Sequence, residues 1–325
     1  MPNRSLEEMP LVSVVTVTYN SSTYIREAIN SILNSSYKNF QLIVGDDCST
    51  DNTWEIISEF HDSRIVTYRN DHNLREYPNR NKAIGLARGE YLIFIDGDDM
   101  IYPHGLEFMV KMLHAFPSCG MALMRWFKND LFYPIIISPE QFYIGEYLGD
   151  SVLGTAFSNI LFRTEILKKN GGLSTRFRAG DDHIRYKIAA TYDSLIISDG
   201  LTWWRETPGQ ASQLFNSSFN GFIEVFEMKF MFLAEESCPL NEIDKINAKE
   251  NLEIAIAKKM VRLLLGFQFS RFLRLQSKFG LSPRKLFKAR HRLISKNPFP
   301  GFSPGNPKKL PFYSNPYSPF YSTNG

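Results

Sequence analysis

Hydrophobic and polar positions along the first 115 residues predict strands that alternate with helices. Uncharged runs rich in β-branched and aromatic residues predict strands at 11–18, 40–44, 65–68 and 91–95. Apolar residues at helical spacing predict helices at 23–33 and 81–88, after the turn that ends at Asp51, and from Pro103 to about Ala115. This order predicts an α/β fold with a doubly wound, mostly parallel sheet flanked by helices.

The pattern changes after Phe116. Strand-like runs follow at 120–127, 132–138, 156–162 and 195–199, and helices are predicted at 164–169 and 182–190. From about Phe219 to about Ser295 the chain is predicted to be helical. Residues 296–325 hold seven prolines and seven aromatic residues without apolar periodicity, so no packed element is expected there. We expect an α/β domain at 1–218, a helical basic extension at 219–295 and an irregular tail at 296–325.

Composition places the chain among globular proteins. It has 325 residues, of which 43% are hydrophobic and 22% are charged. The first 20 residues do not resemble a signal peptide, and no stretch is long and apolar enough to span a bilayer. The three cysteines (Cys48, Cys119 and Cys238) lack metal-ligand spacing, and their odd number argues against a disulfide framework. These features predict a cytoplasmic protein.

Charge is distributed unevenly along the chain. Residues 254–325 hold 14 lysines and arginines and no acidic residue, whereas all 34 acidic residues lie in 1–253. Basic and apolar residues are interleaved in 258–296, a mixture typical of an interfacial helix. We therefore expect 254–296 to bind an anionic membrane surface, and not nucleic acid, because no nucleic-acid-binding motif accompanies the charge. The alternative is a helical bundle packed on the α/β domain, with its basic residues solvated or facing acidic ones.

Polar clusters follow three predicted strands, at the edge where open parallel sheets bind ligands. They are Thr18-Tyr19-Asn20, Asp46-Asp47 and Asp96-Gly97-Asp98-Asp99. Three carboxylates in four residues behind an uncharged strand predict a site for Mg²⁺ or Mn²⁺ that shares its ligands with substrate phosphates. The alternative is a solvated acidic turn, because Asp and Gly are frequent in turns.

A bound nucleotide needs a flat face for its base and an acceptor for the N–H of the ring. Tyr19 offers the face and Asp47 the acceptor, although the same residues would also suit a half-buried strand end and a helix N-cap. The sequence has no glycine-rich phosphate-binding motif. Arg80 or Lys82, together with a metal, would therefore hold a diphosphate; the alternative is that both belong to a solvated helix start.

Three motifs taken together resemble the family 2 glycosyltransferases of the GT-A fold. They are the segments 14–20 (VVTVTYN), 44–53 (VGDDCSTDNT) and 87–99 (ARGEYLIFIDGDD). The resemblance is strong over about 10–115 and weaker to about 212, so it implies a GT-A glycosyltransferase domain at 1–218. It implies inverting, metal-dependent transfer of a sugar from a nucleotide-diphosphate donor, with a UDP-sugar favoured. The acceptor would be a saccharide or a lipid-linked glycan of cell-envelope polysaccharide synthesis.

The resemblance also implies roles for individual residues. The metal ligands would be Asp98 and Asp96, and the residues at nucleotide-sugar-binding positions are Thr18, Tyr19, Asn20, Asp47, Arg80, Asp96 and Gly97. Two positions depart from the pattern. Cys48 stands where the family often has Gly or Asn, and Thr207 replaces the histidine of the family's Tyr-Arg-x-His segment. Gln210 and Ser212 are the candidate replacements for that histidine.

A second acidic cluster, Gly180-Asp181-Asp182-His183, resembles the family's Glu-Asp segment. The resemblance implies that Asp182 is the general base, with Asp181 as the alternative and His183 as a bystander. Inverting transfer needs such a carboxylate to take the proton of the acceptor hydroxyl. The same acids would also suit a helix N-terminus.

Two other functions compete with sugar transfer. A catalytically inactive sugar-nucleotide-binding module would keep the nucleotide site alone, whereas both acidic clusters are present. An aspartate-dependent phosphohydrolase could use Asp96 and Asp98, but it would leave Tyr19 and Asp47 without a role.

Overall fold

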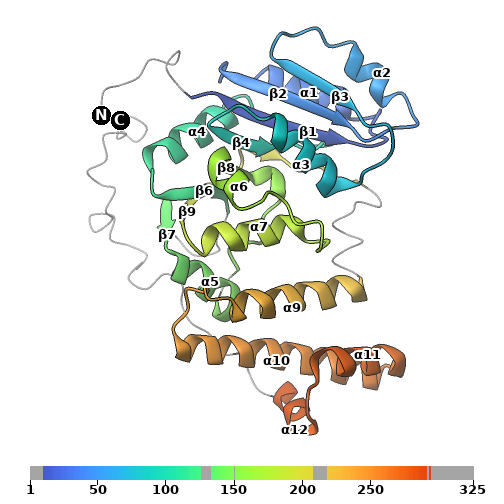
Figure 1. The fold of residues 1–325 in the computed structure, drawn as a ribbon, viewed down its shortest axis with the longest axis vertical. Coiled ribbons are helices and arrows are strands. Elements are labelled where there is room, and N and C mark those ends of the chain that lie inside the picture. Colours follow the sequence, from blue (N-terminus) through green and yellow to red (C-terminus); the bar gives the residue numbers. More distant parts are fainter. Residues whose placement is uncertain (1–9, 126–132, 150, 208–217, 291–292, 294–325) are drawn as a thin grey trace, which may run out of the picture.

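Eight strands form one mixed sheet in the computed structural model, which describes residues 10–125, 133–149, 151–207, 218–290 and 293 (Figure 1). The strands are β1 (Val12–Thr18), β2 (Phe40–Asp46), β3 (Ile65–Arg69), β4 (Tyr91–Phe94), β6 (Cys119–Met124), β7 (Ile135–Ile137), β8 (Ile160–Arg163) and β9 (Asp193–Ile197). Their order in the sheet is β3-β2-β1-β4-β8-β6-β9-β7. Strands β1 to β4 are parallel, β6 is parallel to β9, and β8 and β7 are antiparallel to their neighbours. The predicted doubly wound, mostly parallel sheet is confirmed.

Helices cover both faces of this sheet. One face carries α1 (Ile25–Leu33), α2 (Thr53–Ser58) and α4 (Gly105–Ala115), and the other carries α3 (Glu76–Leu86), α5 (Pro139–Leu148), α6 (Thr164–Lys169) and α7 (Gly180–Ala189). Side chains of β1 alternate between the two cores: Val12 and Val14 pack with α1, whereas Val15 packs with α3. A strand with a side-chain period of two, buried on both faces, requires this uncharged sequence.

A short second sheet lies beside the acidic turn that follows β4. It pairs β5 (Met100–Ile101) with β10 (Thr202–Trp203) in antiparallel fashion, with Thr202 opposite Ile101. Residues 202–207 are therefore held next to Asp98 and Asp99, although they are about 100 residues away in the sequence. A single 3-10 turn, η2 (Phe157–Asn159), precedes β8.

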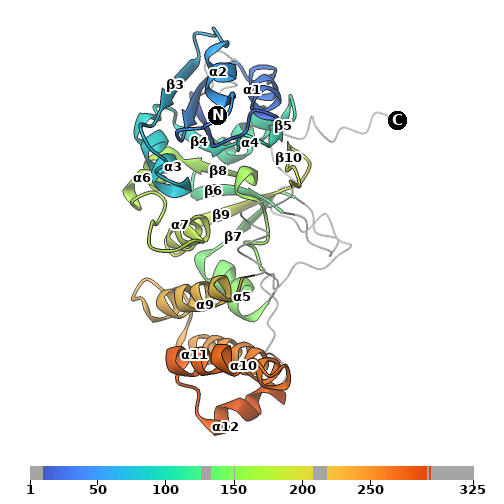
Figure 2. The same ribbon diagram turned by 90° about the vertical axis from the view of Figure 1, so that its right-hand side faces the viewer.

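The C-terminal helices stack beneath α5 and α7 (Figures 1 and 2). They are α9 (Phe219–Ala234), α10 (Glu242–Leu265), α11 (Phe269–Phe279), α12 (Pro283–Leu286) and the 3-10 turn η3 (Phe287–Arg290). Helix α9 contributes Met228 and Phe232 to the core beneath α7, and Ile223 to a smaller core with α10 and α11. The division of the chain at 218 and 295 stays a prediction, and the tail at 296–325 lies outside the described residues. Within the described part of the chain, no helix has the length and apolarity needed to cross a bilayer.

Candidate functional site

Three strand ends meet at one edge of the sheet. Thr18 is paired with Asp46 across β1 and β2, and the backbone N–H of Asp47 donates to the carbonyl of Thr18 at 2.9 Å. After β4 the chain turns back over the same place, so that a Cβ on Gly97 would lie 2.8 Å from Oγ1 of Thr18. Only glycine fits this approach, since real Cβ contacts are longer. The polar clusters predicted at the three strand ends are therefore neighbours.

At this edge, Tyr19 is 48% exposed, so its ring would be accessible to a stacking base. Asn20 has a φ of 52°, and its Oδ1 accepts a hydrogen bond from the N–H of Thr50 at 2.8 Å. Asparagine tolerates this left-handed conformation better than most residues. The bond ties the turn after β1 to the turn after β2, which fixes the position of Tyr19 between them.

Asp47 is buried, and its carboxylate already accepts three hydrogen bonds within the protein. Its carboxylate accepts hydrogen bonds from Nδ2 of Asn70 at 2.8 Å, from the N–H of Leu74 at 2.9 Å and from the N–H of Arg75 at 2.8 Å. A carboxylate has about four lone-pair sites, so one remains for the N–H of a base. The sequence did not predict that Asp47 also holds the loop before α3. Lys82 lies with this loop, because its Nζ donates to Oδ1 of Asn70 at 2.7 Å.

The acidic turn after β4 is anchored from two sides. Oδ1 of Asp96 accepts from Arg80 at 2.7 Å, and Arg205 donates through Nε to the carbonyl of Asp98 at 2.9 Å and through its N–H to Oδ1 of Asp99 at 3.1 Å. Thr207, at the position of the family histidine, places its hydroxyl 3.4 Å from Oδ2 of Asp98. Gln210 and Ser212 lie outside the described residues.

The donor set of this turn fits a hard divalent cation. Burial raises the pKa of Asp98, and the negative charge of Asp96 raises it further. The ionised form of this turn is therefore disfavoured by itself, and a bound cation would stabilise it. Within the described residues, no group of three His, Cys, Asp or Glu side chains is arranged as a metal site. From the part of the chain that the structure describes, Asp96 and Asp98 would be the ligands, and Mg²⁺ or Mn²⁺ commonly completes such a shell with phosphates and water.

The second acidic pair lies in the first turn of α7. Asp181 and Asp182 both accept hydrogen bonds from Arg185, the first at 3.0 Å. Burial raises the pKa of Asp182; the guanidinium of Arg185 opposes this, and Asp181 adds to it. His183 packs between the rings of Phe177 and Phe232, and burial lowers its pKa to about 4. His183 is therefore neutral at pH 7 and lies in an aromatic cluster.

Helix α3 connects the two acidic clusters. Arg80 is buried on this helix and pairs with Asp96 and, at 3.1 Å, with Glu76. One residue after Glu76, the hydroxyl of Tyr77 lies within donating distance of two acceptors, the carbonyl of Arg178 at 2.6 Å and Oδ1 of Asp181 at 3.1 Å. Because Tyr77 and Arg80 are three residues apart, the predicted metal-binding turn and the acidic pair that holds the predicted base contact neighbouring positions on one helix.

Sequence reasoning missed two residues that orient the acids. Arg185 follows Asp182 and Asp181 by three and four residues, the spacing of neighbours on a helix, so a local signal was present. Tyr77 reaches Asp181 across 104 residues of sequence, and no local pattern could indicate that contact.

Comparison with known proteins assigns the part of the chain that forms most of this site. Residues 13–171 match the profile of glycosyl transferase family 2. The chain contains a family 2 glycosyltransferase domain. The matched residues include Tyr19, Asp47 and the turn at 96–99, whereas Asp181 and Asp182 lie beyond them. The resemblance seen in the motifs is confirmed.

Curated relatives of this family 2 domain are named as glycosyltransferases. The putative teichuronic acid biosynthesis glycosyltransferase TuaG of Bacillus subtilis is 34% identical over 151 residues, which are 45% of this chain and 60% of the relative. The UDP-Glc:alpha-D-GlcNAc-diphosphoundecaprenol beta-1,3-glucosyltransferase WfaP of Escherichia coli is 41% identical over 91 residues, 28% of this chain and 36% of the relative. The chain thus aligns with less than two thirds of the length of either relative.

Solved structures share the fold over most of the chain. TarS of S. aureus in complex with UDP-GlcNAc has a TM-score of 0.58 and 20% identity, with 87% of this chain and 76% of that chain covered. The mannosyltransferase PcManGT of Pyrobaculum calidifontis, in complex with GDP-Man and Mn²⁺, has a TM-score of 0.59 and 19% identity, with 87% of each chain covered. The family 2 domain therefore has the GT-A fold expected from the sequence.

Proposed function

We propose that this protein is a metal-dependent, inverting glycosyltransferase of cell-envelope glycan synthesis. The observation that carries the proposal is the arrangement at α3, where an Asp-x-Asp turn and a second carboxylate pair contact neighbouring residues of one helix, next to a family 2 match. The donor is a nucleotide-diphosphate sugar. We favour a UDP-sugar, because the name of the relative WfaP specifies UDP-Glc.

The donor half of the reaction uses residues at the strand ends. Tyr19 stacks on the base, the remaining lone pair of Asp47 accepts the ring N–H, and Thr18, Asn20 and Gly97 shape the wall of the site. Mg²⁺ or Mn²⁺, held by Asp98 and Asp96, would stabilise the negative charge of the departing diphosphate. Arg80 fixes the orientation of Asp96 through their ion pair and adds positive charge next to the diphosphate.

The acceptor half of the reaction uses the first turn of α7. Asp182 takes the proton of the acceptor hydroxyl as that oxygen attacks the anomeric carbon and the bond to the diphosphate breaks. Its raised pKa makes it a better base than an ordinary carboxylate, provided that it is ionised. Arg185 orients both acids. Asp181 remains the alternative base.

Donor binding is tested by titrating the protein with UDP and GDP, each with and without Mn²⁺, and by screening nucleotide sugars for donor hydrolysis. We expect UDP to bind more tightly when Mn²⁺ is present. Nucleotide binding without any turnover would favour the inactive binding module. Hydrolysis of simple phosphate esters without nucleotide binding would favour the phosphohydrolase.

The metal-binding role is tested with Asp98→Asn. Removing one of two carboxylate ligands is expected to abolish the Mn²⁺-dependent part of UDP binding and to lower transfer by about 100-fold or more. Asp199→Asn, which changes an exposed acid elsewhere, is the matched control. Metal-dependent binding that is equal in the two variants would contradict the assignment.

The base is tested with Asp182→Asn and its neighbour Asp181→Asn. We expect Asp182→Asn to lower transfer by about 10²- to 10⁴-fold while the affinity for UDP-sugar is unchanged, since a base acts in the chemical step. If Asp181→Asn instead loses transfer with unchanged affinity for UDP-sugar, and Asp182→Asn transfers normally, Asp181 is the base. Normal transfer by both variants would mean that the two acids only stabilise the N-terminus of α7.

The acceptor we propose is a saccharide or lipid-linked glycan, in keeping with the diphosphoundecaprenol in the name of WfaP. An enzyme that works on such an acceptor has to reach the membrane. We propose that it acts on the cytoplasmic side, as a peripheral protein on the inner face of the membrane, through the basic extension at 254–296.

A further inference from the structure

Seven basic residues of the C-terminal helices form two groups. The first group faces acids of α9 and α10: Lys278 lies 2.5 Å from Glu227, and Lys285 and Lys288 lie 2.5 and 3.0 Å from Glu253. These lysines hold the bundle together, as the alternative interpretation of the sequence expected. The second group consists of Lys259, Arg262, Arg271 and Arg274, for which no acidic partner is present among the described residues.

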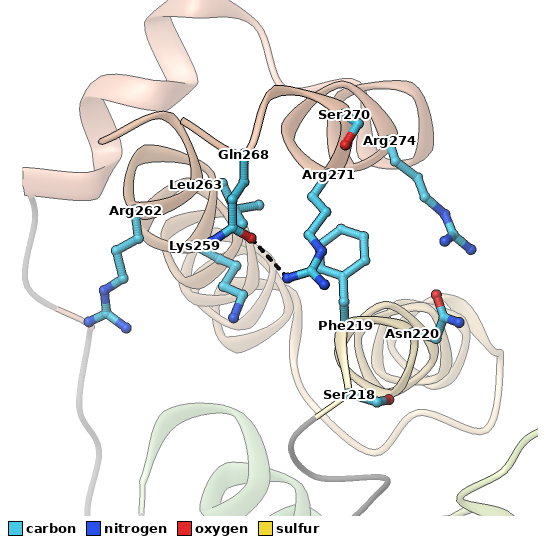
Figure 3. Close-up of a pocket in the computed structure, with 10 residues that line it drawn as sticks. All are labelled: Ser218, Phe219, Asn220, Lys259, Arg262, Leu263, Gln268, Ser270, Arg271 and Arg274. Atoms are coloured by element: carbon cyan, nitrogen blue, oxygen red, sulfur yellow. Dashed lines mark hydrogen bonds between the residues drawn. The ribbon is translucent and has the colours of Figure 1, made fainter. Parts of the chain in front are cut away.

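The second group lines a pocket of about 710 Å³ between α9, α10 and α11. Its wall also includes Ser218, Phe219 and Asn220 at the start of α9, and no acidic residue lines it within the described chain. In Figure 3, Lys259 and Arg271 extend into the space between the helices, and Arg262 and Arg274 extend to either side of it. Four positive charges thus surround one hollow.

Aromatic rings contact three of these four cations without neutralising them. The guanidinium groups of Arg271 and Arg274 lie 5.5 and 5.9 Å from the centre of the Phe219 ring, and Nζ of Lys259 lies 5.6 Å from that of Phe222. The positive end of the 16-residue helix α9 faces the same space, with Ser218 as its N-cap. The pocket is therefore built for a ligand that carries several negative charges.

An apolar corner lies beside the pocket, where α10 turns into α11. Its side chains are exposed although they are large and hydrophobic: Leu265 (76%), Phe267 (81%), Phe269 (55%) and Leu273 (62%). Pocket residues alternate with them in the sequence, since Gln268 and Ser270 line the pocket. A soluble anion would make no use of such a corner, whereas a bilayer would bury it.

We infer that this pocket binds the phosphate groups of anionic phospholipids while the apolar corner enters the bilayer. The N-terminal ends of α7 and α9 and the corner between α10 and α11 lie on one side of the molecule, the right-hand side of Figure 1. The proposed base is thus on the side that faces the membrane. The inference rests on the proposed function in one respect only: the base would need to face the membrane if the acceptor is lipid-linked.

The charge contribution is tested on the full chain with R262Q/R271Q/R274Q, in flotation assays with vesicles of phosphatidylglycerol and phosphatidylcholine. Each basic residue at an anionic surface contributes about fivefold to affinity, so we expect binding to weaken by about 100-fold. The control R88Q/K169Q/K249Q removes three exposed charges elsewhere and is expected to bind like the wild type. Equal binding by the two triple variants would overturn the inference.

The apolar contribution is tested with F267N/L273Q against I243N/I246Q. Ile243 and Ile246 are 73% and 65% exposed at the opposite end of α10, so the control removes matched apolar surface. We expect F267N/L273Q alone to lower vesicle binding, by about tenfold or more. A loss of binding that is equal in both variants would contradict insertion of the corner.

Two further measurements separate the sources of the phosphate and the two proposals. Inorganic phosphate and pyrophosphate at millimolar concentration are added to the vesicle assay. If either ion binds the protein but leaves vesicle binding unchanged, or if neutral vesicles bind equally well, the pocket is not a site for anionic lipid. All vesicle assays omit nucleotide sugar, so their outcome does not depend on sugar transfer. Normal vesicle binding by a protein that shows no sugar transfer in the separate activity assays would refute the proposed function and leave this inference standing.

Discussion

At the scale of single residues, the backbone explains one departure from the family pattern. Cys48 has a φ of 63°, in the left-handed region that glycine and asparagine tolerate and other residues avoid. The family often has one of these two residues at this position. The sequence alone could show the departure, but only the backbone angle gives its physical cause.

This strain predicts the effect of two substitutions. Cys48→Gly relieves a cost of about 1–2 kcal/mol and loses about 0.4–1 kcal/mol to the entropy of the unfolded chain. We expect the Gly variant to be about 0.5–1 kcal/mol more stable than Cys48→Ala, which keeps the strain and also lacks the thiol. Urea unfolding of the two variants measures the difference, and a less stable Gly variant would contradict the argument.

The raised pKa of Asp182 predicts the pH dependence of the reaction. A general base must be ionised, so transfer is expected to rise with pH through a midpoint well above the usual carboxyl range. Asp181→Asn removes a neighbouring negative charge that favours the protonated form, so it lowers the pKa of Asp182 and moves that midpoint to lower pH. Profiles of kcat/KM against pH for both proteins provide the test; a midpoint that does not move would mean that Asp181 is not coupled to the base.

Individual site residues could be predicted where the signal is local. Asp96, Asp98 and Tyr19 directly follow recognisable strands, and parallel strand ends converge by geometry. The hydrogen bonds of Asp47 to the loop at 70–75 could not be predicted, because they depend on how that loop folds back over β2.

At the scale of elements, α3 extends further toward its N-terminus than the sequence indicated. The predicted helix began at residue 81, whereas the structure begins it at Glu76, after Arg75 with a φ of 72°. The additional turn carries Glu76, Tyr77 and Arg80, the three residues that join the acidic clusters. Pro78 concealed this turn, because proline inside a predicted helix indicates a boundary, although the first turn of a helix accepts it.

The contact made by this turn predicts the behaviour of Tyr77→Phe. The variant loses the hydroxyl that Asp181 shares with the carbonyl of Arg178, and hydrogen bonds to charged groups contribute about 1.5–3 kcal/mol. We expect kcat to fall by about tenfold or more while KM for the donor changes little, because the hydroxyl of Tyr77 contacts Asp181 and none of the residues proposed to bind the donor. Tyr147→Phe, which loses a bond to the carbonyl of Lys229 at 2.7 Å, is the control and should change stability only. A shift in donor KM alone would instead give Tyr77 a role in donor binding.

The break between α10 and α11 shows what the sequence pattern left out. The turns near Pro239 and Gly280 were indicated by proline and glycine, and the structure has helix ends at both. The turn at 266–268 was not, because Gly266 is a weak signal by itself and Phe267 adopts a φ of 54° that its residue type disfavours.

At the scale of the whole molecule, α9 joins two cores. Its Met228 and Phe232 pack with Tyr186 of α7, and its Ile223 packs with Met260 of α10. We therefore expect a chain that ends at Ser218 to unfold at lower urea concentration than one that ends at Gly280, because it exposes the surface beneath α7. Circular dichroism during urea titration measures both midpoints. Equal midpoints would support an independent domain at 1–218.

The pairing of β6 with β9 has a practical consequence for anyone who recombines enzymes of this kind. The region recognised by sequence comparison ends at residue 171, yet β9 at 193–197 lies between β6 and β7 and completes the sheet. The strand β10 then holds the acidic turn through β5. In a chimera joined at residue 171, both β9 and β10 would come from the other enzyme. The earliest junction that keeps the native sheet, the pairing of β5 with β10 and the contact of Arg205 with Asp98 lies after Arg205.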